Sequence, residues 1–322
     1  MARRVRGLIA AGLLGALLAG CGDEGAARFS SSDDLRPGGG GALTLTIPPP
    51  GGFLDPLRAQ NPTAQLLSRQ IFEPLVSSQR PPYESGKPSR GLAVGWSHSL
   101  DYRVWAFRLR SGVDFQDGES FNAAAVADNA GRWISDPAGA ALLPGLIAAD
   151  DPRPGLVRFI FASPVRDLPA RLADPRLGIV SPLAIAASAA SGSVASLSGG
   201  TGAFRLAEGE GGVGEADILL RRYGAWWGSD AGLGPALDEL IFRVIVDPGV
   251  RLRLLRDGLV RVAVALEPSQ VAGVRADPLL AAAAAPGALF AFQRSVHGLG
   301  SGLTQPLSGV WIALVQTGSA SP

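Results

Sequence analysis

Alternating apolar and polar positions predict a series of short strands. Leucine or isoleucine occupies every second position of residues 43–47, and residues 102–110 place Trp105, Phe107 and Leu109 on one face. The same pattern predicts strands at residues 157–161, 203–207, 218–223, 240–246 and 260–266. The 240–246 stretch is apolar on nearly both faces, which is typical of a sheet covered by helices.

Helical spacing separates these strands. Asn122 can cap a helix in which Val126, Ala130 and Trp133 fall on one face, because they are spaced four and then three residues apart. The other predicted helices start at Thr63 and stop at Pro74, cover residues 179–190, and cover residues 250–256 before Asp257-Gly258. Strands and helices in this order predict an α/β body.

The pattern fades beyond Leu266. Residues 281–285 are a low-complexity run of alanines that Pro286-Gly287 breaks, and the tail from Gly298 is rich in glycine and serine. The pattern therefore gives only a weak signal for this part of the chain, with Trp311 and Leu314 as the obvious apolar anchors of the tail.

Composition narrows the function classes. The 322 residues correspond to about two domains, and 29 basic residues against 28 acidic ones give a net charge of +1. Nucleic-acid binders need a basic face, so nucleic acid is not expected as a partner. Nearly all the positive charge is arginine, which we interpret as compositional bias.

Metal and nucleophile chemistry have little support. One cysteine and two histidines (His98, His297) rule out an internal disulfide, a zinc site built from cysteines and a histidine cluster, so no metal or cofactor is expected. Residues 95–99 nearly match G-x-S-x-G, but His98 directly follows Ser97, which is the wrong geometry for a triad. Residues 209–214 match G-x-G-x-x-G between two strands, where a hairpin loop is favoured over a dinucleotide site. We predict no catalytic residue and no enzyme.

The first 21 residues are typical of an export signal. Arg3, Arg4 and Arg6 precede an uncharged apolar run at residues 8–18, which is too short to cross a bilayer. Leu-Ala-Gly before Cys21 resembles the lipobox of bacterial lipoproteins, which implies lipidation of Cys21 after cleavage. Removing three of the 29 basic residues leaves 26 against 28 acidic ones, a net charge of −2. We expect an exported protein, held by acyl chains at the outer face of the cell membrane or in the periplasm.

Residues 22–41 are predicted to be a flexible tether. They contain three successive serines, the pair Asp33-Asp34 and a run of four glycines, with few apolar residues. Such a segment behaves as a coil that spans roughly 25 Å. It would hold the folded body away from the membrane.

Three groups of short motifs then carry a family resemblance. The first comprises Leu54-Asp55-Pro56 and residues 70–76; the second comprises residues 92–96, 105–118, 121–123 and Arg132-Trp133; the third comprises residues 200–204, 223–228, 241–245 and 255–258. Their order and spacing resemble family 5, the solute-binding proteins of peptide, dipeptide and nickel ABC importers. The resemblance covers residues 43–265.

The resemblance implies a periplasmic-binding-protein-like α/β fold of type II, with solute held between two lobes that close by a hinge. It assigns residues 42–266 to the first lobe. Residues 267–322 would be a remnant of the second lobe or a returning C-terminal segment, and the second lobe would be truncated. The implied partners are a peptide-like small solute and an ABC permease in the membrane.

Departures from the family pattern leave an alternative open. A cleft needs two walls to bury a ligand, so a single lobe would bind weakly, and the chain could instead be an interaction scaffold or have no function. Leu259 and Arg261 stand where the family usually shows acidic residues. No position matches the family's acidic residue that pairs with the peptide's amino group, so the ligand-binding residues stay unknown.

The chemistry of the individual motif residues favours structural roles over ligand contacts. Gly112 and Gly118 suit turns that need positive φ. Trp226-Trp227 favours core packing, and Glu73 before Pro74 favours a turn or cap over a ligand contact. Arg103, Arg108 and Arg110 are most simply solvated.

Overall fold

The computed structural model describes residues 40–51, 55–77, 88–191, 199–207, 217–229, 237–285 and 288–293, and for Ser191 and residues 281–293 only the backbone is described. The leader with Cys21, residues 22–39 of the predicted tether, residues 209–214 and His297 lie outside these residues. Within the described part of the chain, no helix combines the length and apolar character that a membrane crossing requires.

The larger sheet has seven strands in the order β12-β13-β11-β1-β10-β9-β8. Its strands are β1 (Ala42–Ile47), β8 (Phe204–Leu206), β9 (Ile218–Arg222), β10 (Glu239–Val244), β11 (Val262–Val264), β12 (Leu280–Ala285) and β13 (Ala288–Gln293). β1 runs parallel to both of its neighbours, β10 and β11, while the other pairs are antiparallel. The three parallel strands therefore end at one edge of the sheet.

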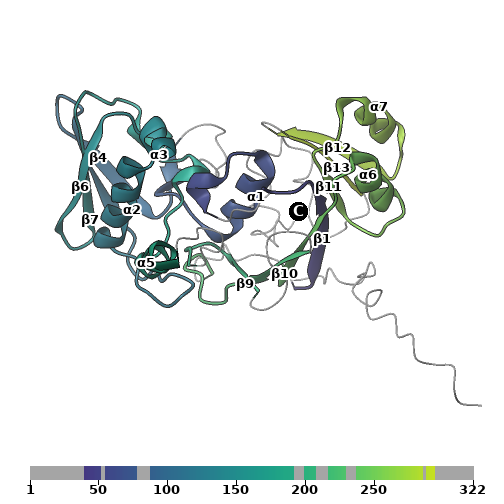
Figure 1. Ribbon diagram of the computed structural model, residues 1–322, viewed down its shortest axis with the longest axis horizontal. Helices are drawn as coiled ribbons and strands as arrows, with labels where there is room; N and C mark the ends of the chain where they lie inside the picture. The colour runs from purple at the N-terminus through teal and green to yellow at the C-terminus, as the bar shows by residue number, and fades with distance from the viewer. Residues whose placement is uncertain are drawn as a thin grey trace, which may run out of the picture.

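The alternation in β1 sets which face of this sheet forms the core. Leu43, Leu45 and Ile47 are buried in a cluster with residues of α1 (Pro62–Ile71), β9 and β10, because strand side chains alternate between faces. Thr44 and Thr46 are also buried, on the opposite face. α1 lies between the two sheets (Figure 1).

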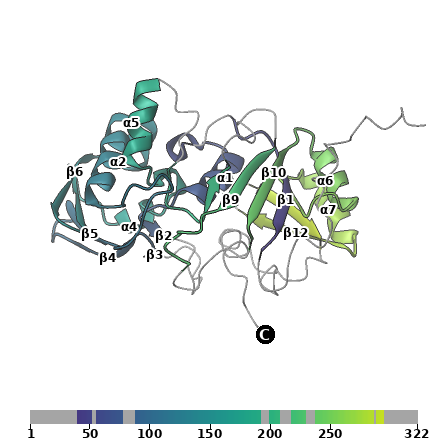
Figure 2. The same cartoon turned by 90° about the horizontal axis from the view of Figure 1, so that it is seen from below.

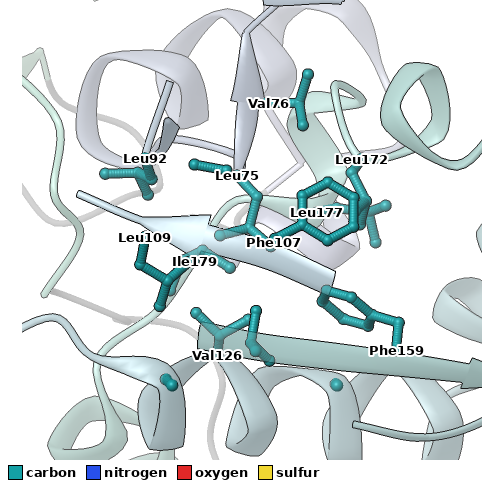
Figure 3. Close-up of a cluster of buried hydrophobic side chains, with 14 of the residues drawn as sticks. Leu75, Val76, Leu92, Phe107, Leu109, Val126, Phe159, Leu172, Leu177 and Ile179 are labelled. Carbon is teal, nitrogen blue, oxygen red and sulfur yellow. The ribbon is translucent and has the colours of Figure 1, made fainter. Parts of the chain in front are cut away.

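The second sheet has four antiparallel strands in the order β4-β5-β7-β6. They are β4 (Ala93–His98), β5 (Val104–Leu109), β6 (Leu146–Arg153) and β7 (Leu156–Phe161). α2 (Ala123–Ser135) covers one face, and Val126 of this helix meets Phe107 and Phe159 of the sheet (Figure 3). This sheet and the seven-stranded sheet form opposite ends of an elongated body (Figures 1 and 2).

Short elements complete the described structure. They are β2 (Val76–Ser77), β3 (Ser89–Arg90), α3 (Pro137–Leu142), α4 (Leu168–Arg171), α5 (Pro182–Ser191), α6 (Pro248–Arg256), α7 (Pro268–Ala276) and the 3-10 helices η3 (Pro56–Arg58) and η4 (Pro175–Leu177). β2 pairs with β3.

Most of the predicted elements are confirmed, with shifted ends. Asn122 caps α2 as predicted, since its side chain accepts a hydrogen bond from the Ala125 amide. The prediction for α1 was wrong at its start. Asn61 is the N-cap, accepting from the Ala64 amide, and Pro62 is the first helical residue, which suits its missing N–H.

Beyond Leu266, where the sequence pattern is weak, the described residues form one helix and two strands. α7 follows β11, and the run of alanines forms β12, which pairs along its whole length with β13. Alanine carries no strand-specific pattern. The hydrogen bonds to β13, which in turn pairs with β11, give this segment its conformation.

Candidate functional site

The motif stretches of the sequence meet at the junction between the two sheets. The side-chain amide of Gln116 donates to the carbonyls of Phe204, Gly202 and Ile71, at 2.7, 2.9 and 3.3 Å. Its backbone amide donates to the Gly200 carbonyl at 2.9 Å. One side chain from the second motif group therefore joins the first group to the third.

Two glycines make this contact sterically possible. A Cβ on Gly200 would lie 1.9 Å from the Ile71 carbonyl oxygen, and one on Gly202 would lie 2.5 Å from the Gln70 carbonyl oxygen. Both distances are far below van der Waals contact, so only glycine fits between this segment and the end of α1. The Gly-Thr-Gly motif is thus explained by close backbone approach.

Glu73 joins the same junction through two tryptophans. Its carboxylate accepts from Trp227 Nε1 at 2.8 Å and from Trp226 Nε1 at 3.4 Å. Trp226 is buried, as predicted, and Trp227 is half-buried against the cores of both sheets. Glu73 is therefore an anchor for the tryptophan pair rather than only a turn residue.

The prediction of a solvated Arg110 was wrong. Its guanidinium carbon lies 4.0 Å from the centre of the Trp227 ring, and its Nε donates to the Gly91 carbonyl at 3.2 Å. Burial lowers the pKa of Arg110, and the charge of Glu73 opposes that shift. The strand pattern gave no sign of this, because Trp227 comes from a segment more than a hundred residues away.

A buried ion pair makes a further connection between motif groups. Arg132 of α2 donates to the Asp55 carboxylate at 2.7 Å, and that carboxylate also accepts from the Leu57 amide. Asp55 is 1% exposed. The motifs that carry the family resemblance thus brace the two sheets against each other.

The carboxyl edge of the parallel strands, where β1, β10 and β11 end, is the candidate ligand edge of this fold. In open α/β sheets, ligands bind in the crevice outside the carboxyl ends of the strands. Beyond β10, Val246 is 76% exposed at this edge, and Asp247 caps α6 by accepting from the amides of Gly249 and Val250. These hydrogen bonds lower the pKa of Asp247, with the Val250 amide contributing most. Sequence reasoning missed this edge, because only strand pairing reveals which ends coincide.

The described residues hold no cluster of three or more histidine, cysteine or acidic side chains that could bind a metal ion. Ser97 and His98 are successive residues of β4, so their side chains point to opposite faces of the sheet and cannot form a nucleophile–base pair. The imidazole of His98 stacks on Tyr102, with 4.1 Å between ring centres.

An open hollow of about 610 Å³ lies beside β4, the edge strand of the four-stranded sheet. Figure 1 places β4 at the opposite end of the body from β1. The walls of the hollow include Trp96, His98, Trp105, Arg166 and Asp167. Three of its polar side chains have partners within the protein: Trp105 Nε1 donates to the Val165 carbonyl, Asp167 accepts from Arg171, and Arg166 lies over Tyr102.

Comparison with known proteins identifies the family. Residues 87–294 match the family described as "Bacterial extracellular solute-binding proteins, family 5 Middle". The chain belongs to this family. The resemblance inferred from the motifs is therefore confirmed, and so is the periplasmic-binding-protein-like α/β fold.

Among curated relatives of this family 5 chain, the glutathione-binding protein GsiB of Escherichia coli (strain K12) is 27% identical over 265 residues, which cover 80% of this chain and 46% of the relative. GsiB of Shigella dysenteriae is also 27% identical, over 279 residues, which are 84% of this chain and 49% of the relative. The chain thus spans about half the length of the curated relatives it matches.

Solved structures share the fold. DppA from Helicobacter pylori, in complex with the peptide STSA, has a TM-score of 0.64 at 20% identity, covering 76% of this chain and 50% of that one. NikA from Brucella suis, in complex with Fe(III)-EDTA, has a TM-score of 0.64 at 24% identity, covering 75% of this chain and 47% of that one.

Proposed function

We propose that this chain is the solute-binding component of an ABC importer and captures a peptide-like solute for a membrane permease. The observation that supports this most is the family match over residues 87–294, on a body whose parallel strands end at one edge. GsiB is named for binding glutathione, and DppA is in complex with a peptide. We infer binding without a chemical step, so the chain is not an enzyme.

The solute would contact the carboxyl edge of β1, β10 and β11. Val246 is an exposed apolar side chain at this edge, available to cover a bound molecule. The junction of Gln116, Glu73 and Trp227 ties the motif segments together and would help to hold this wall rigid. A rigid wall lowers the entropy lost on binding.

Isothermal titration of the full chain tests this proposal, with glutathione, the peptide STSA and a nickel–histidine complex as probes. We expect heat with a peptide-like probe. Val246→Arg should weaken that binding at least tenfold, while Leu100→Arg, at another exposed apolar residue on the β4–β5 turn, should leave it unchanged. Absence of binding to all three probes would favour the alternative of an interaction scaffold without solute binding.

We also propose that Cys21 is lipidated and anchors the exported chain to the membrane. The support is the small-residue motif before Cys21, which follows an apolar run and a basic start. Because Cys21 is the only cysteine, Cys21→Ser removes every thiol at once. Mass spectrometry should find acyl chains on wild-type protein in the membrane fraction and release of Cys21→Ser from it. An unmodified thiol on the exported chain would contradict the proposal.

A further inference from the structure

Arg251 of α6 lies over the carboxyl edge of the parallel strands and is only 3% exposed. Its Nη1 donates to the carbonyls of Ile245 and Val246, at 2.6 and 2.8 Å. Its Nη2 donates to the Ala265 carbonyl at 2.6 Å. Ile245 and Val246 follow β10, and Ala265 follows β11.

The strand order makes these contacts a bridge across the sheet. β1 lies between β10 and β11, so one guanidinium connects the segments on both sides of it. The Ile245 amide also donates to the Ile47 carbonyl at the end of β1, at 2.8 Å. All three parallel strands are therefore fixed to one another where they end.

Stability alone does not explain an arginine at this position. Burial lowers the pKa of Arg251, and the nearby charges of Asp247 and Glu267 oppose the shift. In the described part of the chain its hydrogen bonds go to carbonyls and none to a carboxylate, so the cation is desolvated without a direct ion pair. Such burial is costly, and an apolar side chain often stabilises a buried site better. The guanidinium of arginine, however, spreads its donors over a plane and can reach three separate carbonyls. A lysine ammonium has a single nitrogen and cannot reproduce this geometry.

The residue at the far end of this bridge has an unfavourable backbone. Ala265 has a φ of 56°, in the left-handed region, and among the described non-glycine residues only Tyr102 shares that property. An L-residue there is strained and persists only where its surroundings hold it. The hydrogen bond from Arg251 to the carbonyl of Ala265 is an interaction that stabilises this conformation. This conformation sets the direction in which the chain leaves β11 for α7.

We propose that Arg251 is a positioning residue that fixes the pivot at Ala265 and thereby orients α7 and the β12–β13 hairpin against the carboxyl edge. Its consequence for solute capture rests on the proposed function. Without the bridge, Ala265 relaxes, and the wall beside the solute loses its fixed geometry.

Hydrogen exchange on the full chain, without any ligand, tests the bridge. Arg251→Met should accelerate amide exchange at least tenfold in residues 265–276, with β5 and β7 of the other sheet unchanged, and Arg251→Lys should fall between. Uniform acceleration in both sheets, or no change in residues 265–276, would overturn the proposal.

A mutant cycle gives a second, independent test. Ala265→Gly relieves strain and should raise Tm by about 2 °C in the wild type. The gain should vanish in Arg251→Met, where Ala265 is no longer held. Tyr102→Gly, at the other residue with positive φ, is the matched control, because its change in Tm, which includes loss of the ring contacts with His98 and Arg166, should be the same in both backgrounds. An equal gain from Ala265→Gly in both would contradict a pivot held by Arg251.

Binding is measured separately. Where the wild type binds the peptide probe, Arg251→Lys should weaken binding about tenfold, and unchanged affinity would refute the role in capture. A wild type that binds no probe counts against the proposed function, while exchange and the mutant cycle still decide the bridge.

Discussion

Replacing Gln116 by glutamate would reverse the polarity of the junction without changing its shape. The wild-type amide donates at 2.7 and 2.9 Å to two carbonyls and lies 3.3 Å from a third. A carboxylate has no proton to donate and would face three oxygens. Each lost hydrogen bond costs roughly 1 kcal/mol, and unsatisfied buried carbonyls add to this. Because Gln116 is only half-buried, we expect Gln116→Glu to lower the free energy of unfolding by about 3 kcal/mol at pH 7.

The loss should depend on pH with a definite sign. Carbonyl oxygens disfavour the charged form, so the folded-state pKa of the new carboxyl lies above its unfolded value of about 4.3. The folded variant then binds more protons than the unfolded one, and its deficit shrinks as the pH falls from 7 toward 4. The deficit is fully present above the folded-state pKa.

Urea unfolding followed by tryptophan fluorescence measures this effect at several pH values. Gln60→Glu is the matched control, because Gln60 is exposed and the charge change is identical. A Gln116→Glu deficit within about 0.5 kcal/mol of the control at pH 7 would refute a donating role for Gln116.

Four further variants test the junction, the buried ion pair and the cap of α6. Gly200→Ala should destabilise by about 3 kcal/mol in urea unfolding because its Cβ collides with backbone, whereas Gly131→Ala, in open space on α2, should gain about 0.5–1 kcal/mol; equal effects would contradict the steric argument. Arg132→Met strands the buried Asp55 carboxylate and should cost about 3 kcal/mol by the same assay, and a neutral result would mean that water or another group satisfies Asp55. Because the folded-state pKa of Asp247 is lowered, its charged carboxylate stabilises the fold above the ordinary pKa of 3.8, and this stability is lost as the pH falls through the folded-state pKa. On acidification the free energy of unfolding should therefore fall more for the wild type than for Asp247→Asn. Parallel plots of that free energy against pH would refute this.

The local pattern of apolar and polar residues was enough to predict those strands and helices that have one apolar face within their own sequence. The strand at β5 and the helix after Asn122 were predicted because alternation and helical spacing depend only on backbone geometry. The order of the motifs likewise identified the family without coordinates. Turn glycines were predicted on the same local basis, since Gly112 and Gly118 both have positive φ.

Tertiary structure decided everything that depends on which segments meet. β12 is a run of alanines that becomes a strand only through pairing with β13. Arg110, Arg132 and Arg251 look alike in the sequence, yet one lies on an indole, one binds a buried carboxylate and one bridges three carbonyls. A side chain's charge is written in the sequence, but its solvation and its partners are properties of the fold. For that reason the sequence named the family, while the junction and the carboxyl edge emerged only from the packed strands.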